Sequence, residues 1–130
     1  MPKLKIAIIG MGYVGLELGM ALAKHFDVLG YDIHEERINE LKQHLDRNIQ
    51  FSKSELKKNK LIFTSHIGLI QSATIYIITV PTPALFYEYP DLEMLKNASQ
   101  DIGRLLKKND TVIYESSVYP GTTTQGINCG

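Results

Sequence analysis

Three glycines near the start of the chain constrain its fold more than any other feature. Gly10, Gly12 and Gly15 form the pattern G-x-G-x-x-G within the stretch AIIGMGYVGLELG. The pattern follows an apolar run over residues 4–9, which is typical of a parallel strand buried on both faces. Glycine is entropically costly in ordered backbone, so three of them at this spacing indicate a backbone function at a strand-to-helix turn.

The segments that follow predict an alternation of helices and strands. A helix begins at Tyr13, and a second strand over residues 28–31 ends at Asp32. The residues predicted to share one face of that helix are Val14, Leu18, Ala21, Leu22 and His25. A second helix is predicted over residues 34–47, and its apolar stripe consists of Ile38, Leu41 and Leu45.

The second half of the chain continues this alternation. Strands are predicted over residues 61–63, 74–80 and 111–114, and Asp91 is the expected N-cap of a helix that reaches Leu106. The Lys57-Lys58-Asn59-Lys60 cluster is interpreted as a solvated turn. We therefore predict one α/β domain over residues 1–130, a Rossmann-like doubly wound parallel sheet. Because the chain stops at Gly130, where another helix is expected, we also predict that it is truncated at its C-terminus.

The glycine spacing fits a dinucleotide-binding turn. In that fold the first glycine, Gly10, makes the turn, Gly12 lets the backbone approach a pyrophosphate, and Gly15 lets helix and strand pack closely. Backbone N–H groups at the helix N-terminus then face the phosphates. The remaining candidate cofactor-binding residues of this turn are Met11, Tyr13 and Val14.

An acidic residue at the end of the second strand favours NAD over NADP. Asp32 lies 22 residues after Gly10, close to the offset of about 20 at which an acid binds the ribose diol. A 2′-phosphate at this position would meet like charge. Arg37 leaves an alternative open, because an arginine here can hold a 2′-phosphate; otherwise it is an exposed helix residue.

Charge and cysteine content exclude several other classes. Fourteen basic residues balance fourteen acidic ones, so neither nucleic acid nor a membrane surface is indicated as a partner. Glycines and Glu17 interrupt the apolar run after Lys3 and Lys5, and we predict no secretion signal or membrane span. The single cysteine, Cys129, favours a reducing compartment, and we expect a cytoplasmic protein. The four histidines lack metal-ligand spacing, so no metal site is predicted.

Two loops at strand ends extend the predicted site. TVPTP occupies residues 79–83 and YESSVYPGTT occupies residues 114–123. Ligands of doubly wound sheets lie outside the carboxyl ends of the strands, so both loops are expected to face the crevice of the glycine turn. The candidate cofactor-binding residues in these loops are Val80, Pro81, Thr82, Ser116 and Ser117.

Taken in order, these motifs resemble one family. GYVGLELG, the aspartate at 32, VPTP, PDL at 90–92 and YESSVYPGTT are similar to the N-terminal NAD-binding domain of the UDP-glucose/GDP-mannose dehydrogenase family. The chain looks closest to the branch that acts on UDP-N-acetylhexosamines in polysaccharide and capsule synthesis. The resemblance spans nearly the whole chain.

The resemblance implies a reaction. Family enzymes oxidise the C6 alcohol of a nucleotide sugar, here a UDP-sugar, to an acid with two NAD. A downstream cysteine forms a covalent thiohemiacetal and then a thioester, and Cys129 lies too early in the chain to match it. Ser117, the one candidate catalytic residue, keeps the hydroxyl that a family threonine offers near the nicotinamide. The substrate-binding domains and the helix expected to form a homo-oligomer belong to the part of the family fold beyond residue 130.

Two other functions remain open from the sequence. The chain could be a non-catalytic NAD(H)-sensing module, although sensing requires only the glycine turn and Asp32. It could also be the first domain of a 3-hydroxyacid-type dehydrogenase, although that family usually carries other loops after these strands.

Overall fold

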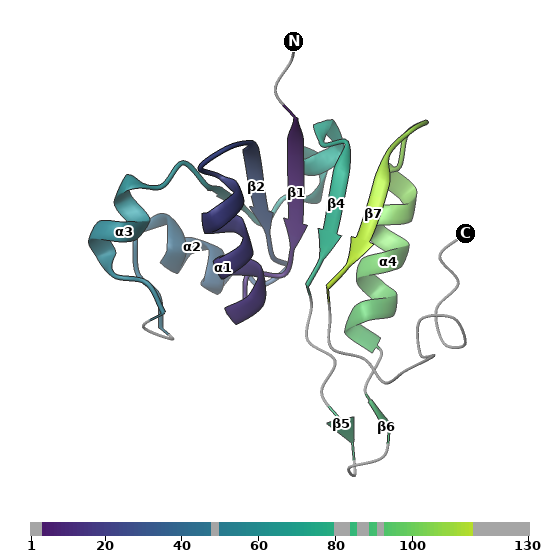
Figure 1. Cartoon of the computed structure of the whole chain (residues 1–130). Coiled ribbons are helices and arrows are strands. Elements are labelled where there is room, and N and C mark those ends of the chain that lie inside the picture. The colour runs from purple at the N-terminus through teal and green to yellow at the C-terminus, as the bar shows by residue number, and fades with distance from the viewer. Residues whose placement is uncertain (1–3, 48–49, 80–83, 86–88, 91–92, 116–130) are drawn as a thin grey trace.

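The computed structural model describes residues 4–47, 50–79, 84–85, 89–90 and 93–115. Five parallel strands form the central sheet in the order β3-β2-β1-β4-β7 (Figure 1). They are β1 (Lys5–Ile9), β2 (Asp27–Tyr31), β3 (Ile62–Thr64), β4 (Ile75–Ile78) and β7 (Thr111–Tyr114). The chain therefore builds outward from β1 in both directions, and the prediction of a Rossmann-like doubly wound sheet is confirmed.

Helices cover both faces of this sheet. The helices are α1 (Tyr13–Leu22), α2 (Glu35–Lys42), α3 (Lys53–Lys58), the 3₁₀ helix η1 (Ile67–Ser72) and α4 (Glu93–Leu105). Buried side chains of α1, α2 and α3 share one core cluster, and η1 and α4 contribute to the other. A separate antiparallel pair, β5 (Ala84–Leu85) and β6 (Tyr89–Pro90), lies beyond the carboxyl ends of the strands (Figure 1).

Both faces of strand β1 are buried, which explains why its sequence shows no alternation of polar and apolar residues. Ile6 and Ile8 point into the core beneath α1, whereas Ala7 and Ile9 point into the core beneath α4. Because its successive side chains alternate between two buried faces, each of these four positions must be apolar. β1 pairs with β2 on one side and with β4 on the other, so the glycine turn begins at the centre of the sheet.

The face of α1 that packs on the sheet agrees only in part with the predicted one, since Leu18 and Leu22 are partly buried against the core. Val14, Ala21 and His25 are exposed, and His25 lies beyond the end of the helix. The residues of α1 that are buried are Gly15, Leu16, Gly19 and Met20. An added Cβ at Gly19 would lie 2.9 Å from the Leu61 side chain. The glycines therefore decide the buried face, because they let the helix backbone approach the sheet more closely than its larger side chains would.

Helix α2 is shorter than predicted. It ends at Lys42, and His44 adopts a left-handed conformation with φ 62°. Ile38 and Leu41 are buried as expected, but Leu45 lies beyond the helix and is 48% exposed. A non-glycine residue in this conformation carries no marker in the sequence, which explains the overextended prediction.

Residues 57–58 are helical, so the prediction of a turn at these positions is wrong. They form the last turn of α3, whose N-terminus has a capping box between Ser52 and Glu55. The predicted N-cap Asp91 lies outside the described residues. None of the helices in the described part of the chain is long and apolar enough to span a bilayer.

Candidate dinucleotide-binding site

The glycine turn is held tightly to the neighbouring strands. Gly10 adopts φ 105°, a conformation that favours glycine, and its N–H donates to the Tyr31 carbonyl at 2.7 Å. Thr79, at the end of β4, has its hydroxyl oxygen 2.8 Å from the Gly10 carbonyl oxygen. An added Cβ at Gly15 would lie only 1.7 Å from that same carbonyl oxygen. The close packing expected of the third glycine is therefore present.

The N-terminus of α1 has free donors and open space. Gly12 is the N-cap, and an added Cβ there would meet no atom within 4 Å. Within the described part of the chain, the N–H groups of Gly12, Tyr13 and Val14 have no hydrogen-bond partner. Unpaired N–H groups and the helix macrodipole together favour an anion at this position. This arrangement fits a pyrophosphate.

Asp32 lies beside the turn, at the carboxyl end of β2. Its Oδ2 accepts a hydrogen bond from the Met11 N–H at 2.8 Å. Its Oδ1 accepts from the His34 N–H at 2.9 Å and lies 2.9 Å from the His34 Nδ1. A carboxylate offers about four acceptor positions, so capacity remains for a ribose hydroxyl. The Met11 N–H, in contrast, is already used by Asp32.

The turn and Asp32 open into a crevice of about 550 Å³ at the carboxyl edge of the sheet. Tyr31 forms part of its lining, and burial raises the pKa of this phenol, helped by the carboxylates of Asp101 and Asp32. Tyr31 is therefore an uncharged hydroxyl at neutral pH.

Several residues that line this crevice were not predicted from the sequence. They are Ile33, His34, Arg47, Ile67, Asn97 and Asp101. Asn97 and Asp101 could have been found, because a spacing of four places both on one face of α4 beside the buried Ile102. Ile67 in η1 had no such marker.

Arg37 is not an exposed helix residue, which corrects one of its two interpretations. It is 8% exposed, and its Nε donates to the Met11 carbonyl at 2.8 Å. Its Nη1 donates to Glu40 at 3.0 Å and to Asp46 at 2.9 Å. Nη2 is buried without a hydrogen-bond partner among the described residues. Burial alone would raise the pKa of Glu40, but the hydrogen bonds from Arg37 and Arg47 outweigh it and lower that pKa.

The candidate cofactor-binding residues on the two strand-end loops are not among those that the structure describes. Val80, Pro81, Thr82, Ser116, Ser117 and Cys129 lie outside the described residues. Among the residues that are described, no group of three or more His, Cys, Asp or Glu side chains could hold a metal ion.

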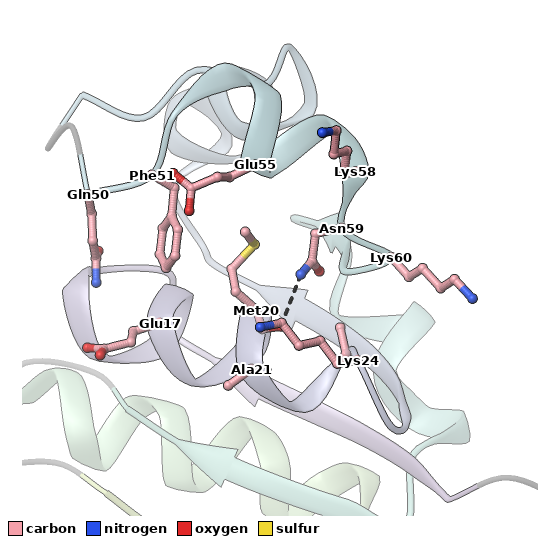
Figure 2. A pocket seen from close by; sticks show the side chains of 11 residues that line it. Glu17, Met20, Ala21, Lys24, Gln50, Phe51, Glu55, Lys58, Asn59 and Lys60 are labelled. Carbon is pink, nitrogen blue, oxygen red and sulfur yellow. Dashed lines mark hydrogen bonds between the residues drawn. The ribbon is translucent and has the colours of Figure 1, made fainter.

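A second pocket, of about 740 Å³, lies between α1 and α3 (Figure 2). The ammonium groups of Lys58 and Lys60 point away from each other, and Glu17 lies at the opposite end (Figure 2). The Asn59 side chain donates to the Met20 carbonyl at 3.0 Å, which links the two elements. The charged groups that line this second pocket do not converge on one point. In the crevice beside the glycine turn, in contrast, the free N–H groups and the Asp32 carboxylate lie close together.

The fold and the crevice together define a class of protein. A doubly wound parallel sheet, a glycine turn with free N–H groups and an acid at the end of the second strand make this chain a dinucleotide-binding domain of the dehydrogenase type.

Comparison with known proteins specifies the family. The model of the UDP-glucose/GDP-mannose dehydrogenase family, NAD binding domain, matches residues 4–129. UDP-N-acetyl-D-glucosamine 6-dehydrogenase from Pseudomonas aeruginosa is 45% identical over 126 residues, which cover 96% of this chain and 30% of that protein. The enzyme with the same name from Salmonella typhi is 46% identical over 124 residues, covering 95% and 29%. The solved UDP-D-ManNAc dehydrogenase of Pyrococcus horikoshii aligns with a TM-score of 0.85 at 32% identity, covering 94% and 30%.

The chain belongs to the UDP-glucose/GDP-mannose dehydrogenase family and corresponds to its NAD-binding domain. The resemblance inferred from the motifs is thereby confirmed, and so is NAD as the cofactor. The chain spans about 30% of the length of the relatives that it matches.

Proposed function

We propose that this chain is the NAD-binding part of an enzyme that oxidises the C6 alcohol of a UDP-N-acetylhexosamine to the uronic acid. The observation that carries the choice of substrate is the identity of 45% and 46%, over nearly the whole chain, to two UDP-N-acetyl-D-glucosamine 6-dehydrogenases. The alternative substrate that we propose is UDP-glucose. Such an enzyme acts in the cytoplasm, in polysaccharide or capsule synthesis, and the whole protein is a homo-oligomer.

Each part of the crevice has a role in this proposal. The free N–H groups of Gly12, Tyr13 and Val14 hold the pyrophosphate, and Asp32 accepts hydrogen bonds from the adenosine ribose. Gly10 and Gly15 shape the turn. The family resemblance adds Val80, Pro81, Thr82, Ser116 and Ser117 to the predicted cofactor-binding residues, and it assigns Ser117 to the nicotinamide end. When bound, NAD supplies the hydride acceptor for the oxidation.

The cofactor part of the proposal is tested by calorimetry on the chain of 130 residues. We expect NAD to bind more tightly than NADP, because a 2′-phosphate would face the Asp32 carboxylate. Tighter binding of NADP would contradict the role of Asp32. The absence of any NAD binding would contradict the proposed site.

The reaction is tested with the same preparation and a panel of UDP-sugars. Covalent catalysis requires an activated nucleophile within reach of the reacting carbon, and the family nucleophile is expected beyond residue 130. We therefore expect NAD binding without NADH formation from UDP-N-acetylglucosamine, UDP-N-acetylmannosamine or UDP-glucose. Turnover by these 130 residues would mean that the catalytic residues lie within them, and the family mechanism would not apply.

A further inference from the structure

Met11, the middle residue of the first Gly-x-Gly, is fixed by groups from two other elements. Its N–H donates to Asp32 at 2.8 Å, and its carbonyl accepts from the Arg37 Nε at 2.8 Å. Its side chain is fully buried beside Gly30, where an added Cβ would lie 2.5 Å from the Met11 sulfur. The shape of the glycine turn is therefore set by β2 and α2 as well as by its own glycines.

The Arg37 guanidinium is enclosed by acidic partners. Its side chain is 9% exposed, and the Asp46 carboxylate that it contacts is completely buried. The Glu40 carboxylate forms a second ion pair with the same Nη1 nitrogen. The Arg37 Nε and Nη1 are already bound, and Nη2 is buried. To present an N–H to a 2′-phosphate, Arg37 would have to move, leaving the Met11 carbonyl and a buried carboxylate without its cation, which is strongly unfavourable.

Asp46 extends this connection to the segment between α2 and α3. Its Oδ2 accepts the N–H groups of Gln50 at 2.9 Å and Phe51 at 3.2 Å. The Gln50 side chain in turn donates to the Tyr13 carbonyl at 3.0 Å. Figure 2 shows the side chains of Gln50 and Phe51 pointing toward α1. The α2–α3 segment thus contacts the glycine turn through Arg37 and the first turn of α1 through Gln50.

We propose that Arg37 is a positioning residue: it holds the glycine turn in the shape that receives the pyrophosphate, and it does not bind a 2′-phosphate. The proposal rests on the proposed function, because NAD is the ligand that the turn receives. Asp46 supports this role because it binds the Arg37 guanidinium, although Asp46 does not line the crevice. Any effect of Asp46 on NAD must therefore pass through Arg37 or the α2–α3 segment.

Two substitutions test this role. Asp46→Asn keeps the size of the side chain and an acceptor for the Gln50 and Phe51 N–H groups, but removes the charge that holds Arg37. Arg37→Lys keeps a cation but lacks the fork that reaches Met11 and Asp46 together. We expect NAD to bind about three- to tenfold more weakly to Asp46→Asn and roughly ten- to a hundredfold more weakly to Arg37→Lys. NADP affinity should fall by the same factors.

The matched controls are Asp110→Asn and Arg104→Lys. Asp110 accepts a hydrogen bond from Lys107 at 2.8 Å and directly precedes β7. Strand β7 begins at the end of the sheet opposite the carboxyl ends of the strands, where the glycine turn lies (Figure 1). The Arg104 side chain is 76% exposed, and among the described residues its one ion pair is with Asp101 at 3.2 Å. We expect Asp110→Asn to lower the melting temperature without changing NAD affinity, and Arg104→Lys to change neither. A merely structural role for Asp46 would make it behave like Asp110.

Amide hydrogen exchange measured without ligand separates this proposal from the proposed function. The N–H groups of Gly10 and Met11, which donate to the Tyr31 carbonyl and to Asp32, should exchange faster in folded Asp46→Asn than in the unmodified chain, whether or not NAD binds. Unchanged exchange, or unchanged NAD affinity in folded Asp46→Asn and Arg37→Lys, would overturn the positioning role. A loss of NADP affinity alone would show that Arg37 contacts the 2′-phosphate. Failure of the unmodified chain to bind NAD would overturn the proposed function and leave the exchange result to decide on Arg37.

Discussion

Two glycines of the turn should respond to substitution in opposite ways. Gly15→Ala would place a Cβ 1.7 Å from the Gly10 carbonyl oxygen and 2.6 Å from the Thr79 hydroxyl oxygen. Backbone atoms cannot yield as a flexible side chain can, so α1 must move away from the strand. Gly12 has φ −83°, and a Cβ added there meets no atom within 4 Å, so we expect valine to fit in the free protein.

The expected magnitudes follow from this geometry. Overpacking costs about 1–3 kcal/mol or more, and the contact at Gly15 is severe enough to expect at least about 3 kcal/mol. For a chain of this size, that corresponds to a fall in melting temperature of roughly 10 °C. Gly12→Val should change the free energy of unfolding by no more than about 1 kcal/mol. Its side chain, however, occupies the space that the pyrophosphate needs, so NAD affinity should be lost.

Thermal and urea unfolding followed by circular dichroism, together with calorimetry against NAD, measures both effects. Gly15→Ala should be destabilised, and Gly12→Val should remain as stable as the unmodified chain without binding NAD. If Gly15→Ala unfolds at the same temperature as the unmodified chain, the close-packing argument is wrong. If Gly12→Val keeps full NAD affinity, the turn does not receive the pyrophosphate.

Three other predictions concern single side chains. Asp32→Ala removes a charge-assisted hydrogen bond worth roughly 1.5–3 kcal/mol, so NAD should bind about ten- to a hundredfold more weakly by calorimetry. Ile38→Ala removes a fully buried side chain, and urea unfolding should show a loss of about 2–5 kcal/mol. The hydrogen bond between Lys107 and Asp110 lowers the pKa of Asp110 and raises that of Lys107. The stabilisation from this hydrogen bond should therefore be lost below about pH 4 and above about pH 10.5. The melting temperature of Asp110→Asn should depend less on pH in both ranges than that of the unmodified chain. An unchanged pH profile in Asp110→Asn would contradict the role of this hydrogen bond.

The elements that sequence patterns predicted best are those with a simple local cause. The strand over residues 111–114 has the predicted bounds, and β1 differs from its prediction by one residue. Both strands are short β-branched or apolar runs with a polar residue or a glycine next to them. The glycine turn also has a local cause. Only glycine readily adopts the positive φ of Gly10 or fits the close packing at Gly15, so the residue types themselves indicate the turn.

What the patterns missed depends on contacts between distant residues. The buried face of α1 is chosen by how closely Gly15 and Gly19 approach the sheet, and a count of apolar residues cannot measure this. The burial of Arg37 depends on Asp46, nine residues away and beyond the end of α2. Helix α3 is different, because its capping box of Ser52 and Glu55 is a local S-x-x-E pattern that the sequence itself contains.

The hydrogen bond between the Asp32 carboxylate and the Met11 N–H has a consequence for cofactor engineering. Converting a domain of this kind to NADP begins with removal of the acid that repels the 2′-phosphate. Here the same carboxylate also holds the glycine turn, so Asp32→Ala would relieve the repulsion and release the turn together. A productive redesign should retain an uncharged acceptor at this position, and Asp32→Asn is the first variant to try. The cation for the 2′-phosphate must also come from a residue other than Arg37, whose guanidinium is already held by Met11 and two carboxylates.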